Sequence, residues 1–139
     1  MSNTYLMFLR EFHGRLVGGI KRTTRRIFQS TSRYNLHKRR FDQQQLVRVW
    51  IGQGHDTTIG YILYTTFYQQ RVGDITKAEL VDEGCISMSV ENFIMKYFTK
   101  QSPDKKTKKK RPRLTYEQAI EQDCTVINFK FFPVRLVVI

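Results

Sequence analysis

The residues best suited to chemistry lie in one short segment, residues 19–26, with the sequence Gly-Ile-Lys-Arg-Thr-Thr-Arg-Arg. Lys21 precedes Thr24 by three residues. A lysine in a poorly solvated pocket loses proton affinity and can act as a base, and a neighbouring threonine hydroxyl can then act as a nucleophile. The segment also carries three arginines, Arg22, Arg25 and Arg26. Because such a row of cations more often contacts phosphates, the residues alone favour binding, and catalysis stays open as the alternative.

A second basic segment, residues 100–113, carries eight lysines or arginines against one acid, a net charge of +7 in a chain of +12. Such a block repels itself and buries no apolar area, so we expect a mobile insertion. Four consecutive cations stand near its centre: Lys108, Lys109, Lys110 and Arg111. They resemble a monopartite nuclear localisation signal, which a nuclear import receptor would bind. The same charges could instead neutralise phosphates of a nucleic acid.

The composition of the whole chain limits the classes of protein to consider. With 139 residues, of which 40% are hydrophobic, the chain fits a single domain spanning residues 1–139. The absence of a long apolar run predicts an intracellular protein without a membrane partner. Two cysteines cannot form a disulfide framework, and the three histidines have no metal-ligand spacing. We therefore expect no metal and no cofactor.

Strand signals occur at both ends and in the middle of the chain. Residues 5–9, 46–51 and 59–67 are rich in β-branched or aromatic residues, and residues 126–132 alternate apolar with polar side chains. Pro133 should end that strand, with a further strand or tail over residues 134–139. The polar residues 30–45 are expected to form a loop.

Helices are predicted by their caps. Thr76 and Glu79 form a Thr-x-x-Glu capping box, and Gly84 should end that helix after about two turns, with Glu83 at its last residue. Further short helices are expected near residues 8–16, after Ser89, and after Thr115. Short capped helices inserted between strands predict an α+β fold, a small mixed β-barrel, rather than a βαβ sheet.

The segment around Lys21 resembles the signature of a known family. Gly19, Lys21, Thr24 and Arg26 match the GxKxxTxR signature of ASCH domains, and the order of expected strands and helices is similar to theirs over nearly the whole chain except the basic insertion. The resemblance implies a PUA-like mixed β-barrel with short helices and a cleft lined by the motif. ASCH domains are generally thought to bind RNA or modified nucleosides, which are the partners implied here.

The chain also resembles the small bacterial ASCH amidohydrolases that act on N(4)-acetylcytidine. Their catalytic Lys, Thr and Glu correspond to Lys21, Thr24 and Glu83 of this sequence. The resemblance implies that Lys21 activates Thr24 for attack on the acetyl carbonyl, while Glu83 passes a proton to the leaving amine. Asp82, beside Glu83, is a rival for the acid role. The extra charge of Arg22 and Arg25 and of the insertion favours a polyanionic ligand.

Three functions follow from these observations. We expect first a nucleic-acid-binding domain, with RNA as the ligand. The first alternative is an amidohydrolase that removes acetyl from N(4)-acetylcytidine. The second alternative is a ribonuclease in which Lys21 stabilises the phosphate transition state and Glu83 serves as the base.

Overall fold

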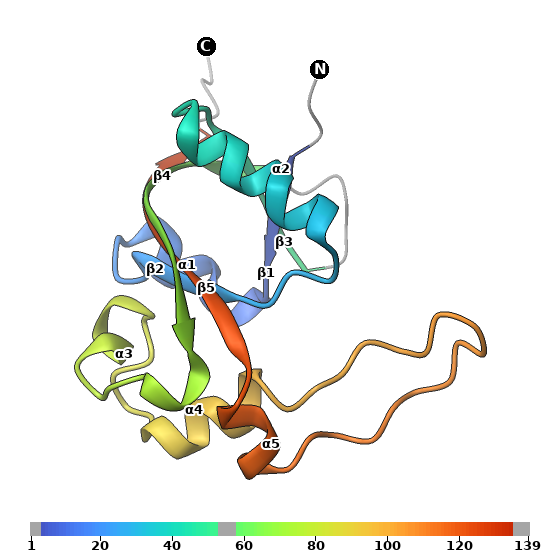
Figure 1. The fold of residues 1–139 in the computed structure, drawn as a ribbon. Helices are drawn as coiled ribbons and strands as arrows, with labels where there is room; N and C mark the ends of the chain where they lie inside the picture. Colours follow the sequence, from blue (N-terminus) through green and yellow to red (C-terminus); the bar gives the residue numbers. More distant parts are fainter. Residues whose placement is uncertain (1–3, 53–57, 135–139) are drawn as a thin grey trace.

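The computed structural model describes residues 4–52 and 58–134 as a small α+β domain (Figure 1). Its centre is a five-stranded mixed sheet, in which β1 and β3 are parallel and the other neighbours are antiparallel. The order of the strands across the sheet is β1 (Tyr5–Phe8), β3 (Val47–Ile51), β4 (Thr58–Arg71), β5 (Asp123–Pro133) and β2 (Thr23–Arg26). The strands expected from the sequence are therefore formed, and the polar segment after Lys21 adds a fifth.

The described sheet is open, which corrects the expected barrel. Its two edges are β1 and β2, and these edges do not pair with each other among the described residues. Met7 and Phe8 of β1 and the side chains of Thr24 and Arg26 of β2 instead line the two sides of one cavity. The cavity thus lies between the two edge strands that would have to pair to close a barrel.

Helix α2 (Thr31–Asp42) replaces the loop that we expected over residues 30–45, so that prediction was wrong. The helix begins after Ser30, whose hydroxyl accepts a hydrogen bond from the backbone N–H of Arg33 at 3.2 Å. Its narrow inner stripe includes His37, which is buried, and Phe41, whose ring lies 5.8 Å from that of Phe67 on β4. A helix can be polar on most of its surface when only such a stripe is packed.

Two helices begin at their predicted caps, whereas α3 (Glu79–Asp82) begins later than its predicted cap at Thr76, with Ala78 at its N-terminal cap. Ser89 caps α4 (Val90–Tyr97), and Thr115 forms the full capping box of α5 (Tyr116–Ile120). The reciprocal bonds between Thr76 and Glu79 are also present. The helix that follows them, α3, is shorter than the two turns expected. The remaining short elements are the 3-10 turns η1 (Arg10–Phe12) and η2 (Val72–Asp74) and the helix α1 (His13–Val17).

The basic segment 100–113 leaves the body as a long arm without helix or strand (Figure 1). Hydrogen bonds join its two limbs, from Leu114 N to Thr99 O at the base (2.8 Å) and from Asp104 N to Lys109 O near the tip (3.0 Å). Its mobility stays a prediction. The expected strand over residues 134–139 lies almost wholly outside the described residues. In the described part of the chain, no helix combines the length and apolar character needed to cross a membrane.

Candidate functional site

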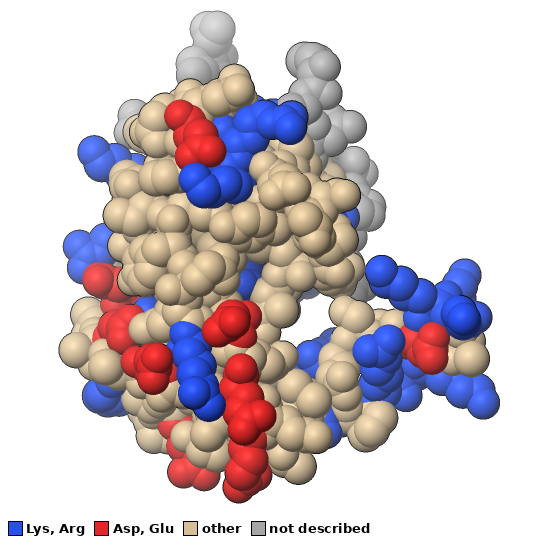
Figure 2. Space-filling model, viewed as in Figure 1, with Lys and Arg blue, Asp and Glu red and all other residues tan. Residues whose placement is uncertain are grey.

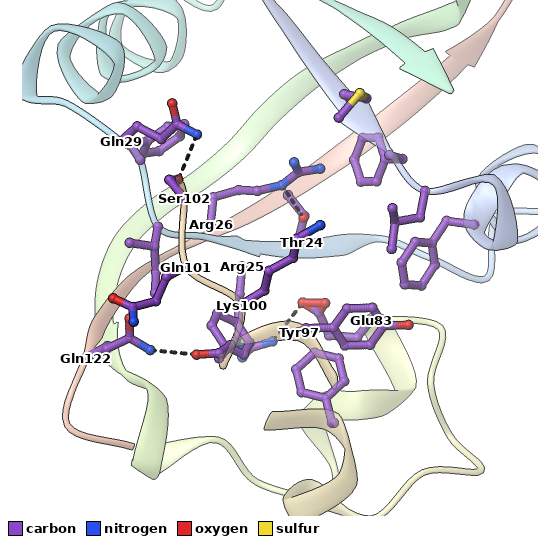
Figure 3. Close-up of a pocket in the computed structure, with 18 of the residues that line it drawn as sticks. Thr24, Arg25, Arg26, Gln29, Glu83, Tyr97, Lys100, Gln101, Ser102 and Gln122 are labelled. Atoms are coloured by element: carbon purple, nitrogen blue, oxygen red, sulfur yellow. Dashed lines mark hydrogen bonds and ion pairs between the residues drawn. The ribbon is translucent and has the colours of Figure 1, made fainter. Parts of the chain in front are cut away.

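A cavity of about 750 Å³ lies between the two edge strands and the base of the arm (Figure 3). Its volume is within the range of small-molecule sites, about 300–1,000 Å³. The lining combines aromatic side chains with polar and charged ones. The aromatic lining residues are Phe8, Phe12, Phe28, Phe93, Tyr97 and Phe98. The charged lining residues are Lys21, Arg25, Arg26, Glu83, Lys100, Lys105 and Arg111.

A tight turn after α1 brings Lys21 into this cavity. Gly19 adopts φ +74°, a left-handed conformation that glycine accepts without steric cost. The turn lets the backbone N–H of Lys21 donate to Arg15 O at 2.9 Å. The next residue, Arg22, donates its N–H to Asp82 O at 2.7 Å, which ties the start of β2 to the end of α3. Lys21 and Glu83 are therefore neighbours although 62 residues separate them.

The ammonium group of Lys21 is buried, with the residue only 3% exposed. It donates hydrogen bonds to Thr23 O (2.9 Å), Glu83 O (3.0 Å) and Glu83 Oε2 (3.1 Å). It also lies 4.3 Å from the centre of the Phe12 ring, a cation–π distance. Burial lowers the pKa of Lys21, while the carboxylate of Glu83 opposes that shift. The contact defines a buried ion pair on the cavity wall.

Glu83 is the centre of a larger buried network. Its Oε1 accepts a hydrogen bond from Arg25 Nη1 at 3.3 Å, and Arg25 also forms an ion pair with Glu79. Gln70 of β4 accepts from Arg25 Nε at 2.9 Å and donates to Glu79. Burial alone would raise the pKa of Glu79, but its hydrogen bonds with Thr76 and the charge of Arg25 lower it. The network fixes the position of Glu83 before any ligand arrives.

Thr24 and Arg26 form a second pair on the same wall (Figure 3). Arg26 Nε donates to Thr24 Oγ1 at 2.9 Å, and the Arg26 guanidinium lies 4.6 Å from the centre of the Phe8 ring. Among the hydrogen bonds of the described residues, none joins Thr24 to Lys21. Lys21, Thr24 and Glu83 thus share one cavity, but the hydroxyl is held by Arg26 rather than by the lysine.

The arm supplies the opposite wall of the cavity. Lys100, Lys105 and Arg111 line it. Gln29, in the connection between β2 and α2, donates to the hydroxyl of Ser102 at 3.2 Å and so links the arm to the body. Figure 2 shows the arm as a cluster of Lys and Arg standing away from a body that carries many acidic side chains on the same face.

The remaining residues proposed from the sequence lie elsewhere. Arg22 is exposed and forms a surface ion pair with Asp82 at 2.8 Å. The described lining does not include Lys108, Lys109 or Lys110, which are exposed on the arm. The rival acid Asp82 has a side chain that is 51% exposed, whereas the side chain of Glu83 is 2% exposed. Only Glu83 of these two acids contacts Lys21.

Several residues of the site carried no recognisable signal in the sequence. Glu79 was predicted only as a capping residue, and Gln70 lies beyond the strand predicted over residues 59–67. Tyr97 and Phe12 lie in segments predicted only as helices, and they pack on each other with ring centres 5.7 Å apart while lining the cavity. Helical periodicity marks which side chains turn inward, but it cannot separate a packed core from the floor of a pocket.

No group of three His, Cys, Asp or Glu is placed to hold a metal ion within the described residues. His37 is buried and hydrogen-bonded to Tyr64 Oη at 2.8 Å, so its role is in packing. His55 lies outside the described ranges. The two cysteines, Cys85 and Cys124, are both free and buried.

Comparisons of the chain with protein-family models, with curated proteins and with solved structures found no match. The function is therefore inferred from the residues of the chain and from the cavity that they form.

Proposed function

We propose that this chain is an ASCH-like domain of the PUA-like class that binds nucleic acid, RNA in particular, in the cavity between β1 and β2. The observation that carries the proposal is a cavity lined both by cations and by aromatic rings, of which Phe28 and Tyr97 are partly exposed. Aromatic rings offer a stacking surface to any base, and lysines and arginines neutralise the adjoining phosphates. The cations come from two separated parts of the sequence, the motif on β2 and the arm.

The electrostatics of the cavity favour a ligand with several phosphates. Lys21 and Arg25 are already paired with buried carboxylates. In contrast, Arg26 contacts a neutral hydroxyl and an aromatic ring, and it forms no ion pair with the described residues. Its guanidinium, together with Lys100, Lys105 and Arg111, therefore provides positive charge that a polyanion can use. The net charge of +12 would accelerate the encounter with such a ligand.

Salt-dependent binding tests this proposal. The affinity for an end-labelled single-stranded RNA is measured by fluorescence anisotropy between about 50 mM and 200 mM salt, where counterion release weakens phosphate contacts steeply. We expect Arg26→Gln to weaken binding and to reduce the salt slope by about 0.7. Lys38→Gln, which removes an equal charge on exposed α2, is the matched control and should change little. An affinity that is independent of salt would refute the proposal.

The second candidate is hydrolysis of N(4)-acetylcytidine, and it is favoured by the Lys21–Glu83 contact beside Thr24. Transfer of a proton from Lys21 Nζ to Glu83 Oε2, 3.1 Å apart, would give a neutral amine and a carboxylic acid. The amine would accept the Thr24 hydroxyl proton as Oγ1 attacks the acetyl carbon. The acid would protonate N4 as the carbon–nitrogen bond breaks, releasing cytidine. Water would then cleave the acetyl-threonine ester to acetate and a proton.

The assay for this candidate is release of cytidine from N(4)-acetylcytidine. Turnover should vanish in Thr24→Val, which keeps the side-chain shape, and in Lys21→Ala, and it should partly survive in Thr24→Ser. Thermal unfolding of each variant separates lost chemistry from lost folding. A wild-type protein that releases no cytidine would refute the amidohydrolase candidate. Gel analysis of RNA incubated with the wild type and Lys21→Ala tests the ribonuclease alternative in parallel.

The exposed cations of the arm support one more expectation, recognition by a nuclear import receptor through Lys108, Lys109 and Lys110. These side chains lie outside the described lining of the cavity. A fluorescent fusion of the chain should accumulate in nuclei, and replacement of these three lysines by glutamine should abolish that accumulation.

A further inference from the structure

The basic arm presents two different sets of cations. Lys100, Lys105 and Arg111 line the cavity, so we call them the inner trio. Three exposed lysines of the same arm, Lys106, Lys109 and Lys110, are outside the described lining, and we call them the outer trio. If the arm served only to raise the net charge of the protein, none of its cations would have to line the cavity. The inner trio contributes to the same cavity as the motif on β2.

The arm also has a defined shape that keeps the inner trio near the cavity. Its limbs are joined at the base by Leu114 N to Thr99 O (2.8 Å) and by Gln101 Nε2 to Pro112 O (2.8 Å). At the tip, the carboxylate of Asp104 accepts from Lys106 N at 2.8 Å and closes a turn. The bond from Gln29 to Ser102 is a contact with the body.

An opening lies between the arm and the body, as the space-filling view shows (Figure 2). The cavity is therefore not a closed hole for a small molecule. One wall carries the motif, the other carries the inner trio, and the space between them continues past the arm. A chain-like ligand can enter such a space and leave it, whereas a free nucleoside would leave the inner trio without a counter-charge.

We propose that the ligand is a nucleotide within a continuous single strand, held between the arm and the body. The inference rests on the RNA-binding function proposed above. One base stacks on a partly exposed ring of the lining, Phe28 or Tyr97, and the phosphates on either side of the base contact the inner trio and Arg26. A paired base would first have to leave its duplex, at a cost of a few kcal/mol, so a single strand is preferred over a double strand.

The decisive experiment compares two variants with the same change in net charge. In the inner variant Lys100, Lys105 and Arg111 are replaced by Gln, and in the outer variant Lys106, Lys109 and Lys110 are replaced by Gln. Binding of a labelled single-stranded RNA is measured for both and for the wild type over a range of salt. Loss of three phosphate contacts should flatten the slope of log affinity against log salt by about 2 in the inner variant. The outer variant should keep most of the wild-type slope.

Three further ligands are tested with the wild type: the matching RNA duplex, a free nucleoside, and the corresponding nucleoside monophosphate. The single strand should bind at least about tenfold more tightly than any of them. Equal losses of affinity and of salt slope in the inner and outer variants would overturn the inference. The arm would then contribute only non-specific charge. Equal affinity for the nucleoside and the strand would also overturn the inference. Failure of the wild type to bind any RNA is a separate result, which refutes the proposed function itself and the inference with it.

Discussion

Replacement of Glu83 by glutamine tests the buried ion network most directly. The substitution keeps the side-chain shape but leaves the Lys21 ammonium, only 3% exposed, with carbonyl acceptors instead of a carboxylate. Removal of one partner of a buried ion pair costs about 3–5 kcal/mol of unfolding free energy. Arg25 should suffer less, because it keeps Glu79 as a partner.

The free energy of deprotonating Lys21 sets an upper limit on this cost. Rather than remain charged, the lysine can lose its proton. For a lysine with the ordinary pKa of 10.5, deprotonation costs about 5 kcal/mol at pH 7 and about 2 kcal/mol at pH 9. In the variant the pKa of folded Lys21 lies further below 10.5, so the folded state binds fewer protons than the unfolded state at pH values between that lowered pKa and 10.5. Its stability should therefore rise with pH relative to the wild type. The penalty of the substitution should shrink from about 3–5 kcal/mol to about 2 kcal/mol between these two pH values.

Equilibrium unfolding in urea at pH 7 and pH 9 measures both penalties by linear extrapolation. The control is Asp82→Asn, which removes the neighbouring but exposed ion pair with Arg22 and should cost no more than about 1 kcal/mol. The double variant Lys21→Met, Glu83→Gln removes both charges and should recover much of the loss. A penalty below about 1 kcal/mol, or one that does not change with pH, would show that the reasoning about this pair is wrong.

Two further predictions concern a histidine and a glycine. Burial lowers the pKa of His37 to about 4 from 6.5, so its contribution to stability is complete above pH 6.5 and is lost as the pH falls toward 4. That loss of unfolding free energy amounts to up to about 3 kcal/mol. It should be absent in His37→Gln when urea unfolding is measured over this pH range. The same dependence of unfolding free energy on pH in both proteins would contradict the prediction. Gly84 has φ +77°, and an added Cβ would lie 3.3 Å from Lys21 Cβ, so Gly84→Ala should lower the unfolding free energy by about 1–3 kcal/mol. Gly14→Ala, where the new Cβ meets nothing within 4 Å, is the control for thermal unfolding, and equal effects would contradict the role of backbone strain.

The elements with a local cause could be predicted from the sequence. The capping box of Thr115 and Gln118 is confirmed, as are the cap at Ser89 and the strand over residues 59–67. In each case the signal and its effect lie within a few residues of each other. The left-handed glycine at 84 likewise ends its helix as expected, because that conformation is a property of the residue itself.

The elements that depend on distant partners could not be predicted in this way. Helix α2 was missed because its inner stripe includes His37, which counts as polar until Tyr64 supplies a hydrogen bond. Strand β2 was missed because its buried side chains are polar and charged, such as Thr24 and Arg25, and only the network around Glu83 makes their burial tolerable. The expected barrel failed for a related reason, since its closure depended on two edges meeting.

The choice between Asp82 and Glu83 shows the same limit within the site. The sequence places both acids at one helix end and cannot assign the inward direction to either. In the fold, Glu83 contacts Lys21 and is buried, whereas the side chain of Asp82 is half-exposed and pairs with Arg22. Which of two successive residues at a helix end points inward depends on tertiary packing, and the local sequence carries no marker of that packing.

The position of β5 between β4 and β2 has a consequence for how the protein is made. Among the described strands, β2 pairs with β5 alone, and its Thr23 lies 105 residues before its contact Asn128. At about 5–20 residues per second of synthesis, β2 and the long open edge of β4 wait for seconds before the strand that joins them leaves the ribosome. During that time the nascent chain carries an unpaired β-edge that other chains can bind. Slow translation near the arm, or a premature stop before β5, should therefore favour aggregation over a partly folded product.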